Sequence, residues 1–176
     1  VRGTSTYPPG SKENGGIFCH ANTWAMVAAA MMGWNERAYQ YYQQVMPLTK
    51  ENYDHYQVEP YVYCQNVCGP THPYFGRGRN AWLTGTAAWT YVAGTQYILG
   101  IRPTFDGLMV QPIIPREWKG FSATRVFRDT VYLITVERLG PGNNVEMIVD
   151  GKPVEGNVVP FQARGGKDVV VHVKLK

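Results

Sequence analysis

The hydrophobic pattern of the chain changes near residue 100. Before that point, apolar residues form runs of helical length, and after it they alternate with polar residues in short stretches. Runs of the first kind predict helices, and alternation predicts half-buried strands. The predicted helices cover residues 24–32, 36–46 and 86–99, and the predicted strands cover residues 126–127, 130–136, 145–149 and 169–175.

The first predicted helix is apolar on nearly every side, which is typical of a helix buried all round. Asn22 or Thr23 is a suitable N-cap, and Gly33 is a suitable end. His20 then lies just before the helix, where a lone histidine is most often a structural hydrogen-bonding residue. Pro47 and Gly100 end the second and third helices.

The second half of the chain predicts an all-β domain. Asp150-Gly151 between two of the strands is a strong signal for a two-residue hairpin. We therefore expect a small antiparallel sandwich, with the boundary between the halves near residues 100–103.

Residues 80–89, NAWLTGTAAW, join an arginine- and glycine-containing loop to the third helix. Either Thr84 or Thr86 can cap that helix through its hydroxyl group. A helix start with free N–H groups also attracts anions. On these residues alone, a capped helix that binds nothing is the plainer interpretation.

Composition limits the function classes. The 17 basic and 13 acidic residues give a net charge of +4 with no basic run, which disfavours nucleic-acid binding. No apolar stretch is long enough to span a bilayer, and the N-terminus lacks a signal-peptide pattern. Of the three cysteines, Cys19, Cys64 and Cys68, the last two lie four apart without a second pair, which is poor zinc spacing. We therefore expect buried or half-buried free thiols in a reducing compartment, and no metal. The 12 Tyr and 5 Trp suit either sugar stacking or a core.

The helical half has buried-type helices but few partners for them, which suits the last helices of a larger helical barrel with functional loops at one end. Four blocks in order, KENGGIFCH (12–20), EPYVYCQ (59–65), NAWLTGTA (80–87) and QYILGIRP (96–103), resemble the cellobiose phosphorylases of glycoside hydrolase family 94. The resemblance implies two parts: residues 1–102 as the last helices of an (α/α)6 catalytic barrel, and residues 103–176 as a C-terminal antiparallel, jelly-roll-like β-sandwich.

The family splits a β-linked disaccharide with phosphate and inverts the anomeric carbon, so cellobiose would give α-glucose 1-phosphate and glucose. Phosphate is itself the nucleophile, so its site needs hydrogen-bond donors rather than a carboxylate base. By resemblance, His20, Thr84 and the Gly85 N–H bind phosphate, Gln65 contacts the donor sugar, and Lys12 and Glu13 line the acceptor site. The resemblance further implies a general acid upstream of this chain, and no cofactor is expected. The resemblance also implies a cytoplasmic homodimer.

Ala21 and Gly3 stand where relatives would carry polar or acidic acceptor contacts, which leaves the acceptor open. Three alternatives remain. A hydrolase of the same barrel class would use Glu59 as its base, and a chitobiose phosphorylase would differ only at the acceptor. A non-catalytic carbohydrate-binding module would bind sugar through residues 104–176.

Overall fold

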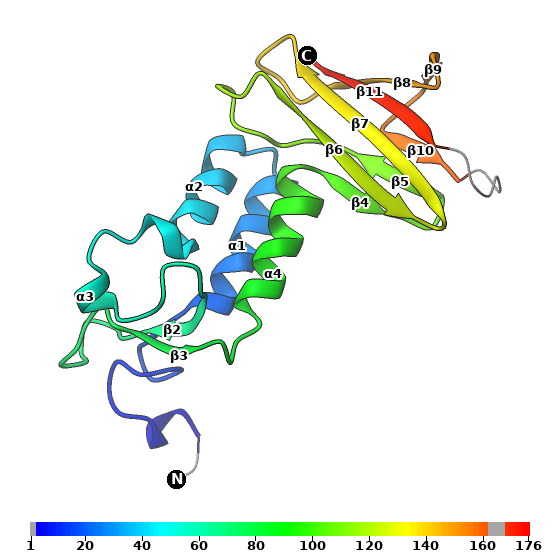
Figure 1. The fold of residues 1–176 in the computed structure, drawn as a ribbon. Coiled ribbons are helices and arrows are strands. Elements are labelled where there is room, and N and C mark those ends of the chain that lie inside the picture. Colours follow the sequence, from blue (N-terminus) through cyan, green and yellow to red (C-terminus); the bar gives the residue numbers. More distant parts are fainter. Residues whose placement is uncertain (1–2, 162–167) are drawn as a thin grey trace. The chain divides into compact units, whose positions relative to one another are not determined.

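The computed structural model describes residues 3–161 and 168–176. Figure 1 labels its helices and strands. The helices are α1 (Cys19–Met31), α2 (Asn35–Val45), α3 (Tyr53–Tyr56) and α4 (Thr86–Val92), with a π-helix at Ala93–Ile98 and single 3-10 turns at Thr4–Thr6 and Pro47–Thr49. The strands are β1 (Ile17–Phe18), β2 (Cys64–Val67), β3 (Gly78–Ala81), β4 (Ile101–Pro103), β5 (Gly107–Val110), β6 (Gly120–Phe127), β7 (Thr130–Arg138), β8 (Val145–Val149), β9 (Lys152–Val154), β10 (Val158–Pro160) and β11 (Val169–Leu175).

The chain forms two compact units. The first comprises Val1–Ala29 and Arg37–Ala93, and the second comprises Ala30–Glu36 and Gly94–Lys176. The mixture of helices with sheets agrees with the predicted α + β class. The barrel, the sandwich and the boundary at residue 102 stay predictions. Among the described residues, no helix has the length and apolar character needed to cross a membrane.

Helix α1 begins five residues earlier than predicted, so Asn22 and Thr23 are not its caps. The Thr23 hydroxyl donates to the His20 carbonyl at 2.7 Å, one turn back inside the helix. Thr23 is fully buried there, and its hydroxyl group donates its hydrogen bond within the helix. His20 is therefore the second residue of α1 and not a residue before it.

The expectation that α1 is buried all round was wrong. Met26 and Ala29 are buried, but Trp24 is 56% exposed and Met31 is 71% exposed. An apolar sequence shows which faces a helix could bury, and here only one face meets the rest of the described chain.

A small sheet in the first unit was not predicted. Its strand order is β1-β2-β3, and its strands are only two to four residues long. Stretches this short carry no visible alternation. In Figure 1 β2 and β3 run side by side below the helices. The sheet matters because β1 leads into His20, β2 contains Gln65, and β3 leads towards Thr84.

The predicted helix at 86–99 is confirmed to within one residue, but its second half is a π-helix and not an α-helix. Helix α4 continues into the π-helix, where the Leu99 N–H donates to the Gly94 carbonyl at 2.8 Å. Gly100 follows with φ 72°, which agrees with its predicted role as the stop.

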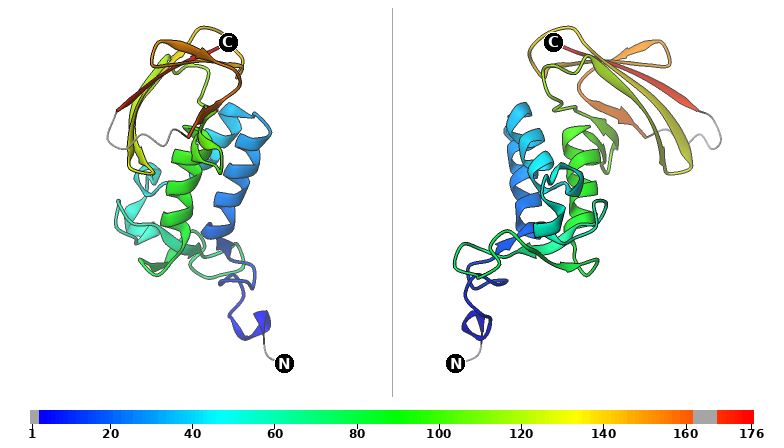
Figure 2. Two further views of the ribbon diagram at one scale, coloured as in Figure 1. Left: turned by 90° about the vertical axis from the view of Figure 1, so that its right-hand side faces the viewer. Right: turned by 60° about the vertical axis from the view of Figure 1, so that its left-hand side comes forward.

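The second unit contains two sheets, visible in Figure 2. One has the order β10-β5-β4 and the other the order β6-β7-β11-β8-β9. Both contribute to one hydrophobic core, which includes Leu108 and Val110 from the first sheet and Ile134 and Val171 from the second. Strands 145–149 and 169–175 and the Asp150-Gly151 hairpin are confirmed. The sheet is not wholly antiparallel, because β11 pairs with β7 in parallel.

Candidate active site

The start of α4 is tied to β2 by a chain of hydroxyl groups. The Thr86 hydroxyl donates to the Cys64 carbonyl at 3.1 Å, and the Thr84 and Thr86 hydroxyl oxygens are 2.7 Å apart. The Thr84 oxygen also accepts from the Thr86 N–H at 3.0 Å. Thr84 therefore does accept from a first-turn amide, as predicted, while Gly85 occupies the N-cap position itself.

Gly85 lies against the ring of His20. A methyl group added at Gly85 would be 2.8 Å from His20 Cε1, closer than two carbon atoms can approach. The backbone does not demand glycine, since Gly85 has φ −75° and ψ −4°. The close approach of the His20 imidazole therefore explains why residue 85 is a glycine. Two residues predicted to bind phosphate, His20 and Gly85, are thus in contact.

Two tryptophans hold the His20 ring. The ring centroid of His20 lies 5.6 Å from that of Trp24 and 6.2 Å from that of Trp89. Sequence reasoning missed both tryptophans. The available signal was the i, i+4 spacing of His20 and Trp24, which puts both on one helix face only if the helix starts before His20.

Two of the predicted site residues carry buried polar atoms that have no hydrogen-bond partner in the described chain. These atoms are Nε2 of His20 and Oε1 of Gln65. Buried polar atoms in native proteins are nearly always hydrogen-bonded, so exceptions call for a specific reason. A polar ligand at this place supplies one.

Buried thiols fix the two backbones that carry these side chains. Cys19 precedes His20 and Cys64 precedes Gln65, and their sulfur atoms are 3.8 Å apart. The Tyr56 hydroxyl lies 3.2 Å from the Cys64 sulfur. Hydrogen bonds from Cys19 and Tyr56 lower the pKa of Cys64, and the bond to Cys64 together with burial raises that of Cys19. All three cysteines are free and buried, as predicted.

Lys12 and Glu13 do not share one environment. Lys12 lines a pocket of the first unit, with its Nζ 5.1 Å from the centre of the Tyr7 ring. Glu13 is exposed and is not among the described residues that line this pocket. Gly3 and Ala21 are both exposed, so neither supplies a buried contact.

The carboxylate of Glu59, which a hydrolase would need as its base, already has a partner. Its Oε1 accepts from the indole N–H of Trp82 at 3.1 Å, and a backbone hydrogen bond together with this one lowers the pKa of Glu59. The group is fully exposed. An exposed, ionised carboxylate held by Trp82 is poorly suited to activate a buried water molecule.

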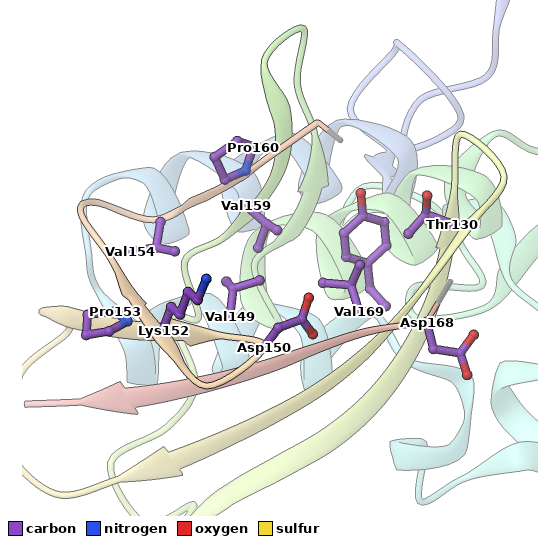
Figure 3. Close-up of a pocket in the computed structure, with 11 residues that line it drawn as sticks. Thr130, Val149, Asp150, Lys152, Pro153, Val154, Val159, Pro160, Asp168 and Val169 are labelled. Atoms are coloured by element: carbon purple, nitrogen blue, oxygen red, sulfur yellow. The ribbon is translucent and has the colours of Figure 1, made fainter. Parts of the chain in front are cut away.

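One pocket of the second unit offers little to a sugar ring. Figure 3 shows this pocket of about 650 Å³, with aliphatic and proline side chains inside it and Asp150, Lys152 and Asp168 around them. Tyr132 is the one aromatic residue among the described lining, and it is only 2% exposed. Sugar-binding modules need an open aromatic face. This pocket therefore gives no support to a carbohydrate-binding module.

Comparison with known families gives a match over the first part of the chain. A family model described as the glycosyl hydrolase 94 superfamily, catalytic domain, matches residues 2–100. The chain belongs to the glycosyl hydrolase 94 superfamily. Its match covers every predicted site residue of this chain.

Several curated proteins are similar to this chain. N,N'-diacetylchitobiose phosphorylase of Vibrio proteolyticus is 41% identical over 167 residues, which is 93% of this chain and 21% of that protein. Solabiose phosphorylase of Paenibacillus borealis is 36% identical over 165 residues, 90% of this chain and 21% of that protein. The cyclic beta-(1,2)-glucan synthase NdvB of Rhizobium meliloti is 40% identical over 136 residues, 75% of this chain and 5% of that protein. The chain spans about a fifth of the length of the two phosphorylases.

The hydroxyl group of Thr84 allows a direct test of its two roles. Thr84→Val in the full-length enzyme removes the acceptor for the Thr86 N–H and one predicted phosphate donor. We expect a loss of about 1 kcal/mol of stability from the lost cap, and a several-fold rise in the apparent phosphate constant. Thermal unfolding and phosphate saturation curves measure these separately. Thr84→Ser keeps the hydroxyl and should match the wild type in both. An unchanged phosphate constant for Thr84→Val would leave Thr84 as a cap only.

Proposed function

We propose that this chain is part of an inverting disaccharide phosphorylase, in which it supplies the phosphate site and part of the sugar sites. The phosphate oxygens are held by His20 and the Gly85 N–H, and by the Thr84 hydroxyl once its proton turns from the Thr86 oxygen to the phosphate. Gln65 contacts the donor sugar, and Lys12 and Glu13 lie on the acceptor side. The general acid comes from the upstream portion of the same enzyme.

The observation that carries the proposal is the unsatisfied Nε2 of His20, whose ring Gly85 touches at the start of α4. No described residue accepts a hydrogen bond from the Gly85 N–H. An imidazole N–H and a free backbone N–H side by side form a site for an anion. A carboxylate at this place would instead favour water as the nucleophile and would repel phosphate.

In the proposed reaction, a phosphate oxygen forms the new bond to C1 of the donor sugar, and the glycosidic C1–O bond breaks. The upstream acid gives its proton to the leaving oxygen, and the product is an α-hexose 1-phosphate. The donors of this chain orient the phosphate on the face of the ring opposite the leaving group. Holding the phosphate and the donor sugar within reach of each other lowers the entropic contribution to the activation barrier.

The leaving sugar is a separate question. The phosphorylases similar to this chain carry different substrates in their names, N,N'-diacetylchitobiose and solabiose. Cellobiose therefore stays a prediction, with N,N'-diacetylchitobiose as the second candidate because two proteins of that name are more than 40% identical to the chain.

The test is a product assay on the full-length enzyme. We expect phosphate-dependent release of an α-hexose 1-phosphate from cellobiose, N,N'-diacetylchitobiose or another β-linked disaccharide, detected by phosphorus NMR. The isolated 176-residue chain, which lacks the acid, serves as the control and should give no turnover. Release of two free sugars without any need for phosphate would contradict the proposal and favour a hydrolase.

A further inference from the structure

The buried thiols beside the candidate site form a pair that the proposed reaction does not use. The sulfur atoms of Cys19 and Cys64 are 3.8 Å apart, although 45 positions separate the two residues along the chain. Both are free, and Cys19 is 7% exposed and Cys64 2% exposed. Two sulfur atoms in van der Waals contact need only a small movement to reach the bond length of a disulfide, about 2.05 Å.

Hydrogen-bond donors converge on one of the two sulfur atoms. The Tyr56 hydroxyl lies 3.2 Å from the Cys64 sulfur, and burial together with this bond raises the pKa of Tyr56, so its oxygen keeps the proton. The register of β2 on β3, with Asn66 opposite Arg79, places the Arg79 backbone in hydrogen-bond reach of the same sulfur. The bond from Cys19, followed by these two, lowers the pKa of Cys64. Cys64 is therefore the thiolate of the pair and Cys19 the thiol, and the thiolate is the form that reacts with oxidants.

Both cysteines are joined to the proposed phosphate site through the backbone. Cys19 directly precedes His20. The Cys64 carbonyl accepts from the Thr86 hydroxyl at 3.1 Å, so a movement of Cys64 extends to the start of α4. The His20 ring has no space to follow freely, because it already lies against Gly85. A bond between the two sulfur atoms would therefore displace groups that the proposed function assigns to phosphate.

We propose that Cys19 and Cys64 are a redox modification site, at which a hydroperoxide forms a reversible disulfide that weakens phosphate binding. The dithiol is the form that binds phosphate well, and the disulfide is the form that binds it poorly. The inference rests on the proposed function, because the bond acts on the phosphate site described there. Formation of the bond itself does not depend on that function.

With hydrogen peroxide the oxidation has two steps. The Cys64 thiolate attacks one peroxide oxygen, so that an S–O bond forms, the O–O bond breaks and hydroxide leaves. The sulfur is thereby oxidised by two electrons to a sulfenic acid, and the peroxide is reduced. The Cys19 sulfur then attacks the Cys64 sulfur, the S–S bond forms, the S–O bond breaks, and the Cys19 proton leaves with the hydroxyl group as water. A dithiol reductant reverses the modification by thiol–disulfide exchange.

The experiment treats the reduced full-length enzyme with hydrogen peroxide and maps its disulfides by mass spectrometry of peptides prepared without reductant. We expect a peptide pair linked through Cys19 and Cys64 that disappears after dithiothreitol. Isothermal titration calorimetry then measures the binding of inorganic phosphate to both forms, which requires no turnover. We expect a dissociation constant about tenfold or more higher for the disulfide form, because His20, a charge-assisted donor, is displaced. Dithiothreitol should restore the reduced value.

Two variants test the roles of the thiols. Cys19→Ala removes the thiol that closes the disulfide, so peroxide should leave Cys64 as a sulfenic acid, which dimedone labels. Cys68→Ala is the matched control, because Cys68 is the third buried free thiol of the chain. It should form the same linked peptide and show the same loss of phosphate affinity on oxidation. The main comparison uses two redox forms of the wild type and does not depend on the folding of either variant.

Two results would contradict the inference and leave the proposed function standing. The reduced enzyme could bind phosphate while no peptide linked through Cys19 and Cys64 forms, which would make both thiols purely structural. The linked peptide could also form without a change in phosphate affinity, which would separate the thiols from the site. A reduced enzyme that binds no phosphate would instead remove the proposed function and the regulation of its site, and the peptide map would then report the disulfide alone.

Discussion

Gly85→Ala in the full-length enzyme is expected to weaken phosphate use as much as His20→Ala does. The backbone at Gly85 is ordinary for any residue, so alanine adds no strain of its own. Its methyl group would be 2.8 Å from His20 Cε1 and 3.2 Å from Nδ1, so the imidazole has to move. The ring packs against Trp24 and Trp89, and a shift of the imidazole moves Nε2 from its position. Loss of a charge-assisted donor costs about 1.5–3 kcal/mol, or roughly tenfold to a hundredfold in the apparent phosphate constant.

The double variant His20→Ala/Gly85→Ala separates this explanation from others. If Gly85→Ala acts only by displacing the imidazole, it has no further effect once the imidazole is gone, and the two changes are non-additive. Phosphate saturation of all four proteins gives the coupling, with melting temperatures as the folding control. Additive losses would mean that Gly85 acts independently of His20.

Ile134→Ala is expected to cost about 2–5 kcal/mol of unfolding free energy, because it leaves a cavity in the core of the second unit. Ile134 is 2% exposed and belongs to the core that both sheets share. Its neighbour Leu133 points to the other face of β7 and is 39% exposed. Leu133→Ala is the matched control and should cost less than about 1 kcal/mol. Urea unfolding followed by circular dichroism measures both, and equal losses would contradict the assigned core.

The sequence predicted those strands and turns that depend on local residue patterns and not on distant partners in the chain. Alternation over 145–149 and 169–175 and the Asp150-Gly151 turn are local signals, and all three agree with the structure. The start of α1 was missed because the Thr23 hydroxyl can serve either as a cap or as a bond to the preceding turn. The strands β1 to β3 were missed because their pairing, not their composition, defines them. The parallel partner of β11 is likewise a property of the whole sheet.

The same distinction applies to the candidate site. His20 and Gly85 came from separate sequence blocks, and the structure brings them into contact. The pairing of Asn66 with Arg79 depends on the register of two four-residue strands, which no sequence pattern states. The roles of His20, Thr84, Gly85, Gln65, Lys12 and Glu13 remain proposals for the experiments above.

The central place of β11 has a consequence for how the protein is made. β11 lies between β7 and β8 in the sheet, although β8, β9 and β10 separate it from β7 along the chain. While the ribosome is still translating the chain, the β6–β7 and β8–β9 hairpins can form from local pairs. Each then presents an open edge until Val169–Leu175 emerges. A nascent or prematurely terminated chain without β11 therefore leaves the edges of β7 and β8 unpaired. Unpaired strand edges bind chaperones or pair with other chains and aggregate.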